Sequence, residues 1–528
     1  GVLAALAERY LESAEAGREI ARLASLALPA RGSGGIFFEP DGAWDVRFIS
    51  GGNNYHFTMT PPREGTRAVT GEAKLAGGTL SAKGALRFDA DRKFRPVLEV
   101  AFQSEDIRKF APAAERSTPY RPFAFWAKAN LVRLDDKFVL DRITFQSAQG
   151  VNGSGQIALA PPGGMLRGDI KFTEIPLPVL AMLTLGSTER DDSQWSTDNF
   201  DIAFAARFNG EFAVEAARLK LSDRVHLRDV RFVAKVRSDE ILLDNITGTF
   251  GEGTRGQKGG GRFSGSFRAI QSMPRSAELQ LNFEGAPVSN LLDTFALRGE
   301  AGGSVNVSMT GNSPSQLVAS LSGQGRVKVA NFVLENADPN AIATVMAADI
   351  RKAPDEKAVE AMFAEALNRG HLRLDAIDAP FLLTNGILRF QAARAATVGV
   401  EVTANGTLDL NRLAMETQIT LESPLSRKAG ATLRWSGPFS APERKLDTRA
   451  LFAALSVKMI EREPRGDIKE TPKQDVVPDL PPAIVVPDKK KRDRSSERPQ
   501  QPNAVPPPLN LSPLPLTPGA PRERQIQN

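Results

Sequence analysis

The chain has 528 residues, of which 41% are hydrophobic and 24% charged, so most of it is able to bury apolar surface. Its formal net charge is only +5, from 67 basic and 62 acidic residues, which is less than the clustered excess that nucleic-acid binding requires. Cysteine is absent, which excludes disulfides, a thiolate nucleophile and cysteine-based metal sites. Chance explains that absence, or else an oxidising compartment in which stray thiols are avoided.

Residues 1–28 are predicted to form an amphipathic helical segment, because charged residues such as Glu8, Arg9 and Arg18 interrupt its apolar positions. That pattern is neither a signal peptide nor a membrane anchor. No apolar run in the chain reaches the roughly 18 residues needed to span a bilayer as a helix. Any anchor is therefore expected upstream of Gly1.

Residues 29–275 are predicted to form a repetitive β region in which apolar and polar residues alternate. Because side chains in a strand alternate faces, each strand has one dry and one wet face. A strand, turn and glycine-spaced strand recur at 138–159, 241–267 and 387–410. A strand ending in an aromatic residue, followed by a short helical stub, recurs at 97–110, 168–183 and 277–297. The irregular spacing of the second motif excludes propellers and tight solenoids and fits a meander.

Residues 276–445 are predicted to form a second β region with the same texture. Near its end, alternation predicts a strand with one dry face, formed by Leu413, Met415, Thr417, Ile419 and Leu421. Before it, Asn385-Gly386 and Asn405-Gly406 are predicted to form tight hairpin turns, because both residue types tolerate positive φ.

Three further segments are predicted outside the strands. An insertion at 339–369 carries Val359, Phe363 and Leu367 at helical spacing, and either covers the end of the sheet or binds a partner. A terminal helix at 446–463 is expected to begin at the N-cap Asp447 and to stop at Pro464. Residues 464–528 hold 15 of the 36 prolines and are predicted to be a disordered tail.

Motifs that suggest chemistry lack the context they need. The glycine pattern at 251–256 matches a dinucleotide-binding loop, but a strand follows it instead of the required helix. His56, His226 and His371 are far apart in sequence, and none has a second histidine at ligand spacing. The pair Asp191-Asp192 does not single out a general acid and base. The sequence therefore predicts no enzyme, no catalytic residue, no cofactor and no metal.

Residues 279–442 resemble the C-terminal region of the AsmA-like family, within the AsmA/TamB group of bacterial envelope proteins. The resemblance is carried by the hairpin at 299–311 and by LVASLSGQGRVKV at 317–329, FLLTNGILRF at 381–390 and VEVTANGTLDL at 400–410. The closing Trp435-Ser436-Gly437-Pro438 and a terminal helix with Lys458, Glu461, Arg462 and Glu463 also match. The insertion at 339–369 is longer than expected for the family.

The resemblance implies a fold and a function. The fold would be a mostly β, long curved antiparallel sheet of amphipathic strands that forms an apolar groove, with a few capping helices. The chain would lie in the periplasm of a Gram-negative-type envelope, anchored to the inner membrane, and would bind or transfer phospholipid and support outer-membrane assembly. The basic run at 489–492 is either solvated or contacts a membrane surface, outer-membrane components or cell wall. Acyl chains would contact groove residues Leu413, Met415, Ile419, Leu421, Val400, Val402, Leu388, Phe390, Val305 and Val307.

Two interpretations of the dry face remain open at this point. It lines an open groove for acyl chains, or it is the interior of a closed sandwich or of a scaffold that assists outer-membrane protein assembly. A sheet of about 20 strands at ~4.8 Å spacing would be roughly 100 Å long. The two helices expected beside it are too few to cover so long an apolar strip, which favours the groove.

Overall fold

The computed structural model describes residues 32–462 except 51, 76, 89–93, 107–122, 136, 161–164, 187–194, 201–202, 204, 223–224, 252–259, 289–295, 349–354 and 425. The expected helix at 1–28, the tail at 464–528, the pair Asp191-Asp192 and most of the glycine pattern at 251–256 lie outside the described residues.

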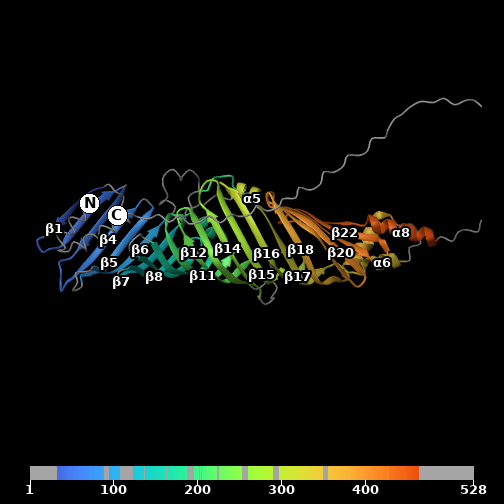
Figure 1. Cartoon of the computed structure of the whole chain (residues 1–528), viewed down its shortest axis with the longest axis horizontal. Helices are drawn as coiled ribbons and strands as arrows, with labels where there is room; N and C mark the ends of the chain where they lie inside the picture. The colour runs from blue at the N-terminus through green and yellow to red at the C-terminus, as the bar shows by residue number, and fades with distance from the viewer. Residues whose placement is uncertain are drawn as a thin grey trace, which may run out of the picture. The chain divides into compact units, whose positions relative to one another are not determined.

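The described residues form one 23-stranded sheet in which each strand pairs with the next along the chain. Figure 1 shows the strands lying side by side along the length of the sheet. Its first half comprises β1 Gly32–Phe38, β2 Trp44–Ser50, β3 Asn53–Met59, β4 Thr66–Leu75, β5 Gly78–Phe88, β6 Phe94–Ser104, β7 Phe125–Leu134, β8 Lys137–Ser147, β9 Asn152–Ala160, β10 Met165–Pro176 and β11 Gly210–Lys220. Its second half comprises β12 His226–Val236, β13 Glu240–Phe250, β14 Arg262–Ile270, β15 Arg275–Pro287, β16 Leu297–Gly311, β17 Ser322–Glu335, β18 His371–Thr384, β19 Ile387–Thr397, β20 Val400–Asp409, β21 Ala414–Ser423, β22 Ser426–Pro438 and β23 Glu443–Asp447.

The predicted mostly β fold, a long curved antiparallel sheet, is confirmed. β15 runs through the expected boundary at 275/276 and pairs with β14 and β16, so the two predicted β regions share one sheet. The three strand–turn–strand motifs are the hairpins β8–β9, β13–β14 and β19–β20. Of the three predicted helical stubs, the one after β10 is α3 Leu177–Thr184.

One pair departs from the antiparallel pattern. β10 and β11 are parallel, with Ile170 opposite Val214. Antiparallel neighbours place their turns on alternate long edges of the sheet, which we call rim 1 and rim 2. Rim 1 carries Pro176 and Val398, and rim 2 carries Gln271 and Leu410. Because parallel neighbours need a crossover, residues 177–209 return the chain from rim 1 to rim 2.

One of the two predicted Asn-Gly turns is confirmed and the other is wrong. Asn385 and Gly386 have φ of +52° and +74° and form the two-residue turn between β18 and β19. Asn405 and Gly406 instead lie inside β20, where Gly406 is opposite Thr417. The glycine serves close packing there, because a Cβ at position 406 would lie 2.5 Å from the Thr417 Cγ2 atom.

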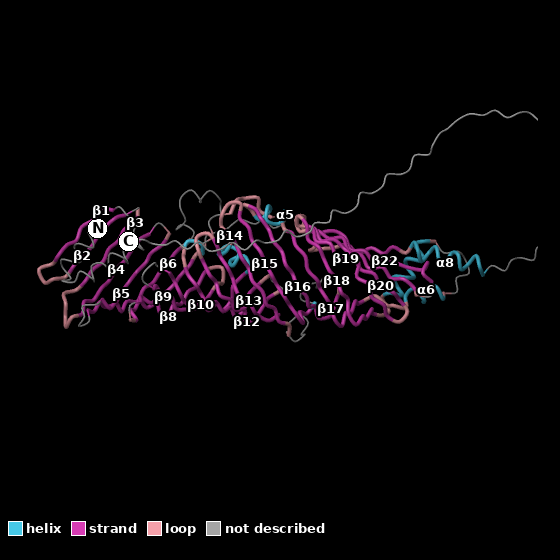
Figure 2. Tube along the Cα trace, viewed as in Figure 1, coloured by secondary structure: helices cyan, strands magenta, loops and turns pink. Residues whose placement is uncertain are grey.

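Helices are few among the described residues, and Figure 2 shows α6 and α8 grouped beside β20 and β22. The insertion contains α6 Ala341–Ala347 and α7 Glu356–Leu367, and the terminal helix is α8 Arg449–Arg462. Asp447 ends β23, and its carboxylate accepts the backbone N–H of Arg449. A helix not specifically predicted, α5 Pro314–Ser320, begins after Ser313, whose hydroxyl accepts the Gln316 N–H.

Candidate functional site

The feature that runs through the whole described sheet is one apolar face. Residues directly opposite each other in adjacent strands share a face, so the register can be followed from strand to strand. We define the apolar face by one residue from each strand, β1 to β23: Phe38, Val46, Phe57, Val69, Leu80, Val100, Ala127, Phe145, Ile157, Ile170, Val214, Phe232, Leu243, Phe267, Leu279, Val305, Val327, Ile377, Leu388, Val402, Ile419, Leu433 and Leu446.

Aromatic rings on this face form a row across neighbouring strands. The ring centroids of Phe102, Phe125, Phe145 and Phe172 follow one another at 6.3, 6.1 and 5.3 Å. β9 lies between the last two and contributes Gly153, where an added Cβ would collide with the Phe145 ring. The glycine therefore lets the rings lie over the backbone and keeps the row continuous. The sequence signal that could have identified the aromatic row is a glycine within a strand whose other alternate residues are apolar.

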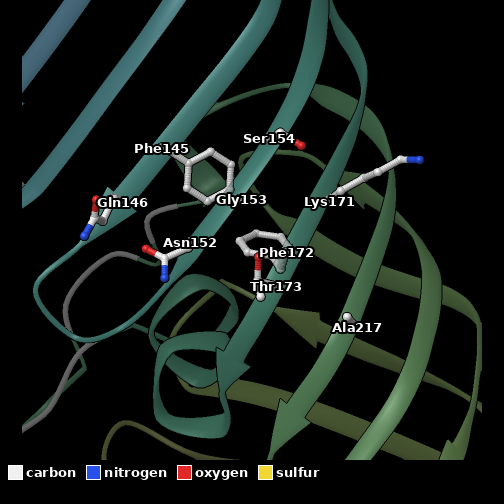
Figure 3. Close-up of a pocket in the computed structure, with 9 residues that line it drawn as sticks. All are labelled: Phe145, Gln146, Asn152, Gly153, Ser154, Lys171, Phe172, Thr173 and Ala217. Carbon is white, nitrogen blue, oxygen red and sulfur yellow. The ribbon is translucent and has the colours of Figure 1, made fainter.

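Phe145, Gly153 and Phe172 also border an open hollow of about 540 Å³, shown in Figure 3. The other lining residues are polar or small: Gln146, Asn152, Ser154, Lys171, Thr173 and Ala217. Lys171 is opposite Glu215 and Phe172 is opposite Ala216, so the lining draws on both faces of the sheet. The hollow is therefore not a closed cavity within the apolar face.

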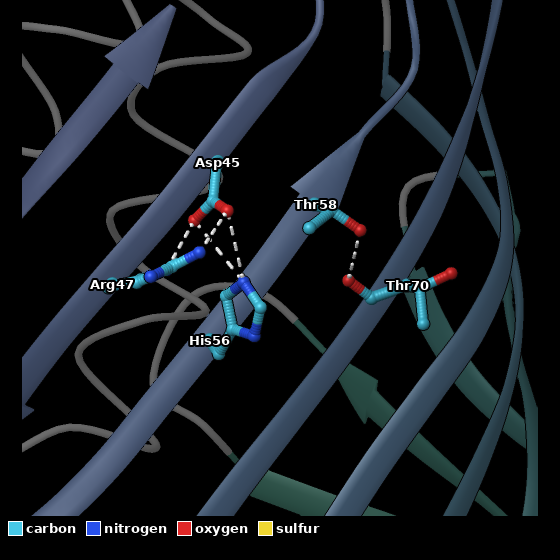
Figure 4. A network of polar contacts seen from close by, with 5 residues as sticks. All are labelled: Asp45, Arg47, His56, Thr58 and Thr70. Carbon is cyan, nitrogen blue, oxygen red and sulfur yellow. Dashed lines mark hydrogen bonds and ion pairs between the residues drawn. The ribbon is translucent and has the colours of Figure 1, made fainter.

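The opposite face carries charge. In Figure 4, Asp45 accepts two hydrogen bonds from Arg47, at 3.0 and 2.8 Å, and its carboxylate lies 3.2 Å from the His56 Nε2 atom. Beside them the Thr58 hydroxyl donates to the Thr70 carbonyl oxygen. The Arg47 hydrogen bond is the main cause that lowers the pKa of Asp45. The cluster is solvated, so it keeps this face wet and offers no enclosed site for catalysis.

Helices cover the apolar face at the β23 end. We call the buried group there the cap cluster: Phe332, Leu334, Ile342, Val345, Val359, Phe363, Leu367, Leu372, Leu374, Val400, Val402, Leu421, Ala431, Leu433, Trp435, Leu451 and Leu455. Val359 and Phe363 of α7 and Leu451 of α8 are each 0% exposed. The expectation that the insertion covers the end of the sheet agrees with this packing.

A second covered region lies in the middle of the sheet. Its buried residues form the crossover cluster: Val179, Ala203, Ala206, Val214, Ala216, Val230, Phe232, Ala234, Val236, Ile241 and Leu243. The first three belong to the crossover and the others to β11–β13. Away from both clusters most residues of the apolar face are half-buried, as at Leu98, Val100 and Phe102 in β6 and at Val305 in β16, whereas Val69 in β4 and Val307 in β16 are buried.

The ten residues predicted to line a groove fall into three groups. Val400, Val402 and Leu421 are buried in the cap cluster, and Ile419 packs against it. Met415, Leu388, Phe390 and Val305 are half-buried on the apolar face, and Val307 is buried there. Leu413 was wrongly assigned to a strand: its φ of +51° places it in the turn before β21.

The three histidines do not come together in the structure. His56, His226 and His371 lie in β3, β12 and β18. Within these ranges, no three histidine or carboxylate residues gather closely enough to hold a metal ion. Of the helices in the described part, none is long and apolar enough to cross a bilayer.

Comparison with known proteins adds no relationship: no family model matches the chain, and no curated protein matches its sequence.

Proposed function

We propose that this chain binds phospholipid by its acyl chains along the apolar face and transfers it. The observation that carries the proposal is the continuous apolar face, most of whose residues are half-buried outside the two covered regions. Side chains left partly in water gain from apolar contact, at about 25 cal/mol per Å² of surface buried. A row of such side chains along successive strands suits a long, flexible apolar ligand. The proposal involves no catalysis, cofactor or metal.

The cellular setting is part of the same proposal and rests on the resemblance of residues 279–442 to the AsmA-like family. The chain would be the periplasmic part of a protein anchored in the inner membrane through a segment upstream of Gly1. It would support the assembly and integrity of the outer membrane. The basic, proline-rich segment at 464–528 would contact outer-membrane or cell-wall components.

A second candidate is a scaffold that assists outer-membrane protein assembly without moving lipid. Edge strand β1 favours it, because among the described residues β1 pairs only with β2. The side chains of Phe37 and Phe38 on that strand are 56% and 42% exposed. An open strand edge is a template for another strand.

The test that separates the two candidates is lipid analysis of the purified chain. The chain is isolated without detergent, extracted with organic solvent and examined by mass spectrometry. Lipid binding predicts phospholipid in at least equimolar amount. A lipid-free chain that still binds an unfolded outer-membrane β-strand peptide would favour the scaffold and contradict lipid transfer.

A further inference from the structure

The crossover between β10 and β11 joins the two rims of the sheet. α3 begins directly after Pro176, at rim 1. At its other end, the Thr184 carbonyl oxygen accepts a 2.8 Å hydrogen bond from the Gln271 side chain, and the Leu185 carbonyl oxygen accepts one from Arg275. Gln271 and Arg275 belong to the β14–β15 turn and the start of β15, at rim 2. α3 therefore runs from one rim to the other.

The length of α3 limits the distance between the two rims at this point, and that distance indicates how strongly the sheet curves. A helix of eight residues is about 12 Å long. A straight strand of twelve residues, such as β10, would be about 40 Å long. So short a helix joins the two rims only if the strands curve around the apolar face and bring their ends together. α3 thus crosses the sheet on the side of the apolar face and covers that face.

The space beneath α3 is filled with protein side chains. Val179 of α3 is 9% exposed, and Phe232 and Ala234 on the sheet below are each 8% exposed. Leu180, Met182 and Leu183 of α3 pack against the same cluster. On either side of this region, Ala82 of β5 and Ala379 of β18 are half-buried on the same face. The apolar face is therefore accessible on both sides of the crossover and closed under it.

The later part of the crossover is bonded along rim 2. The Phe200 N–H donates to the Asn312 carbonyl oxygen at 2.8 Å, and the Ser315 N–H donates to the Ser196 carbonyl oxygen at 3.0 Å. The Trp195 indole donates to the Leu410 carbonyl oxygen at 2.6 Å. These bonds connect the segment to the turns after β16 and β20. The described parts of the crossover are thus held at several points.

We propose that the crossover divides the acyl-chain surface into two sites, one on β1–β10 and one on β15–β19, and that lipid passes between them only when α3 leaves the sheet. This inference rests on the proposed function. At ~4.8 Å per strand, the first site is roughly 45 Å long and the second roughly 20 Å. One bilayer leaflet, half of a ~30 Å hydrocarbon core, is about 15 Å deep. The second site therefore suits a single phospholipid, and the first suits two or three.

The absence of cysteine allows a direct test with single thiols. Three variants of the full chain carry Ala82→Cys, Ala234→Cys or Ala379→Cys, which are small changes on one face. Each is incubated with phosphatidylcholine vesicles in which one acyl chain ends in a maleimide. Lipid adducts are then counted by intact-protein mass spectrometry. N-ethylmaleimide in urea must label all three variants equally, which shows that each thiol is reactive.

Division into two sites predicts adducts at positions 82 and 379 and at least tenfold fewer at position 234. Equal labelling at all three positions would overturn the division and leave lipid binding intact, because the groove would then be continuous. Labelling at only one of positions 82 and 379 would overturn the two-site assignment. No adduct at any position would refute the proposed function, and the inference with it.

A second measurement tests whether α3 can be displaced. In the Ala234→Cys background, Gln271→Ala removes the hydrogen bond to the end of α3, and Trp195→Phe removes the bond to Leu410. Each change is expected to raise lipid labelling at position 234 several-fold. The matched control is Gln103→Ala, an exposed glutamine on the polar face of β6, which should leave labelling unchanged. Equal labelling in all of these variants would overturn the proposal that α3 gates passage.

Discussion

The indole nitrogen of Trp195 donates a 2.6 Å hydrogen bond to the carbonyl oxygen of Leu410, 215 residues further along the chain. Trp195 belongs to the crossover between β10 and β11, whereas Leu410 lies in the turn after β20. The crossover therefore contacts a turn between two strands of the C-terminal half of the chain. Together with the bonds of Phe200 and Ser196 to the turn after β16, the Trp195 hydrogen bond connects this segment to rim 2 at two separate turns.

We expect Trp195→Phe to loosen this tie while leaving the sheet folded. The substitution keeps an aromatic ring and removes the N–H donor, at a cost of about 1 kcal/mol for one hydrogen bond. Hydrogen exchange should become faster at the Phe200 and Ser315 amides, which bond the same segment to rim 2. Trp126→Phe, on the exposed face of β7, is the control and should change neither amide. Unchanged exchange in Trp195→Phe would show that the crossover is held by its other contacts.

The cap cluster should respond strongly to loss of volume. Phe363 is 0% exposed, and Phe363→Ala is expected to cost about 3–5 kcal/mol, from lost transfer free energy and the cavity left behind. Unfolding is followed by circular dichroism during a urea titration. Val398→Ala, at a turn residue that is 90% exposed, should leave the midpoint unchanged. Equal midpoints for the two variants would contradict the assignment of α7 to a buried cap.

The two Asn-Gly pairs should tolerate substitution differently. Asn385 has φ of +52°, so Asn385→Thr places a β-branched residue in the left-handed region and should cost about 1–2 kcal/mol. Asn405 is inside β20, where Asn405→Thr should be neutral or stabilising by a few tenths of a kcal/mol, because threonine suits strands. Melting temperatures of the two variants test this contrast. The reverse order would restore the turn predicted at 405–406.

The stability of the fold should depend slightly on pH through the carboxylate of Asp45. Because Arg47 lowers the pKa of the folded-state carboxyl, this interaction stabilises the protein above the unfolded-state pKa and is lost as the pH falls through the folded-state pKa. Asp45→Asn should therefore flatten the fall in melting temperature below about pH 4. Thr58→Ala, on the same face, should keep the wild-type profile. Parallel profiles for wild type and Asp45→Asn would show that the ion pair does not contribute to stability.

Sequence reasoning identified the sheet because the alternation of side chains in each strand depends only on that strand and its two faces. It could not identify the parallel pair. The alternation of apolar and polar residues around Ile170 in β10 and around Val214 in β11 is the same whether the two strands run parallel or antiparallel. Asn405-Gly406 misled the turn assignment because a glycine that makes room for Thr417 looks, in sequence, like a turn glycine. Burial of Val400 and Leu421 under helices depends on contacts between segments that are distant in sequence.

The central claim, that the open part of the apolar face binds acyl chains, is tested most directly at two adjacent residues of β16. Val305 lies on the apolar face and Ser304 on the exposed face. Phospholipid that co-purifies with the wild type, Val305→Asp and Ser304→Asp is measured by mass spectrometry, with circular dichroism to confirm folding. An aspartate at position 305 has no buried partner and repels an acyl chain, so Val305→Asp should lose a large part of its lipid while Ser304→Asp keeps the wild-type amount. Equal lipid in the two folded variants, or none in the wild type, would contradict the account.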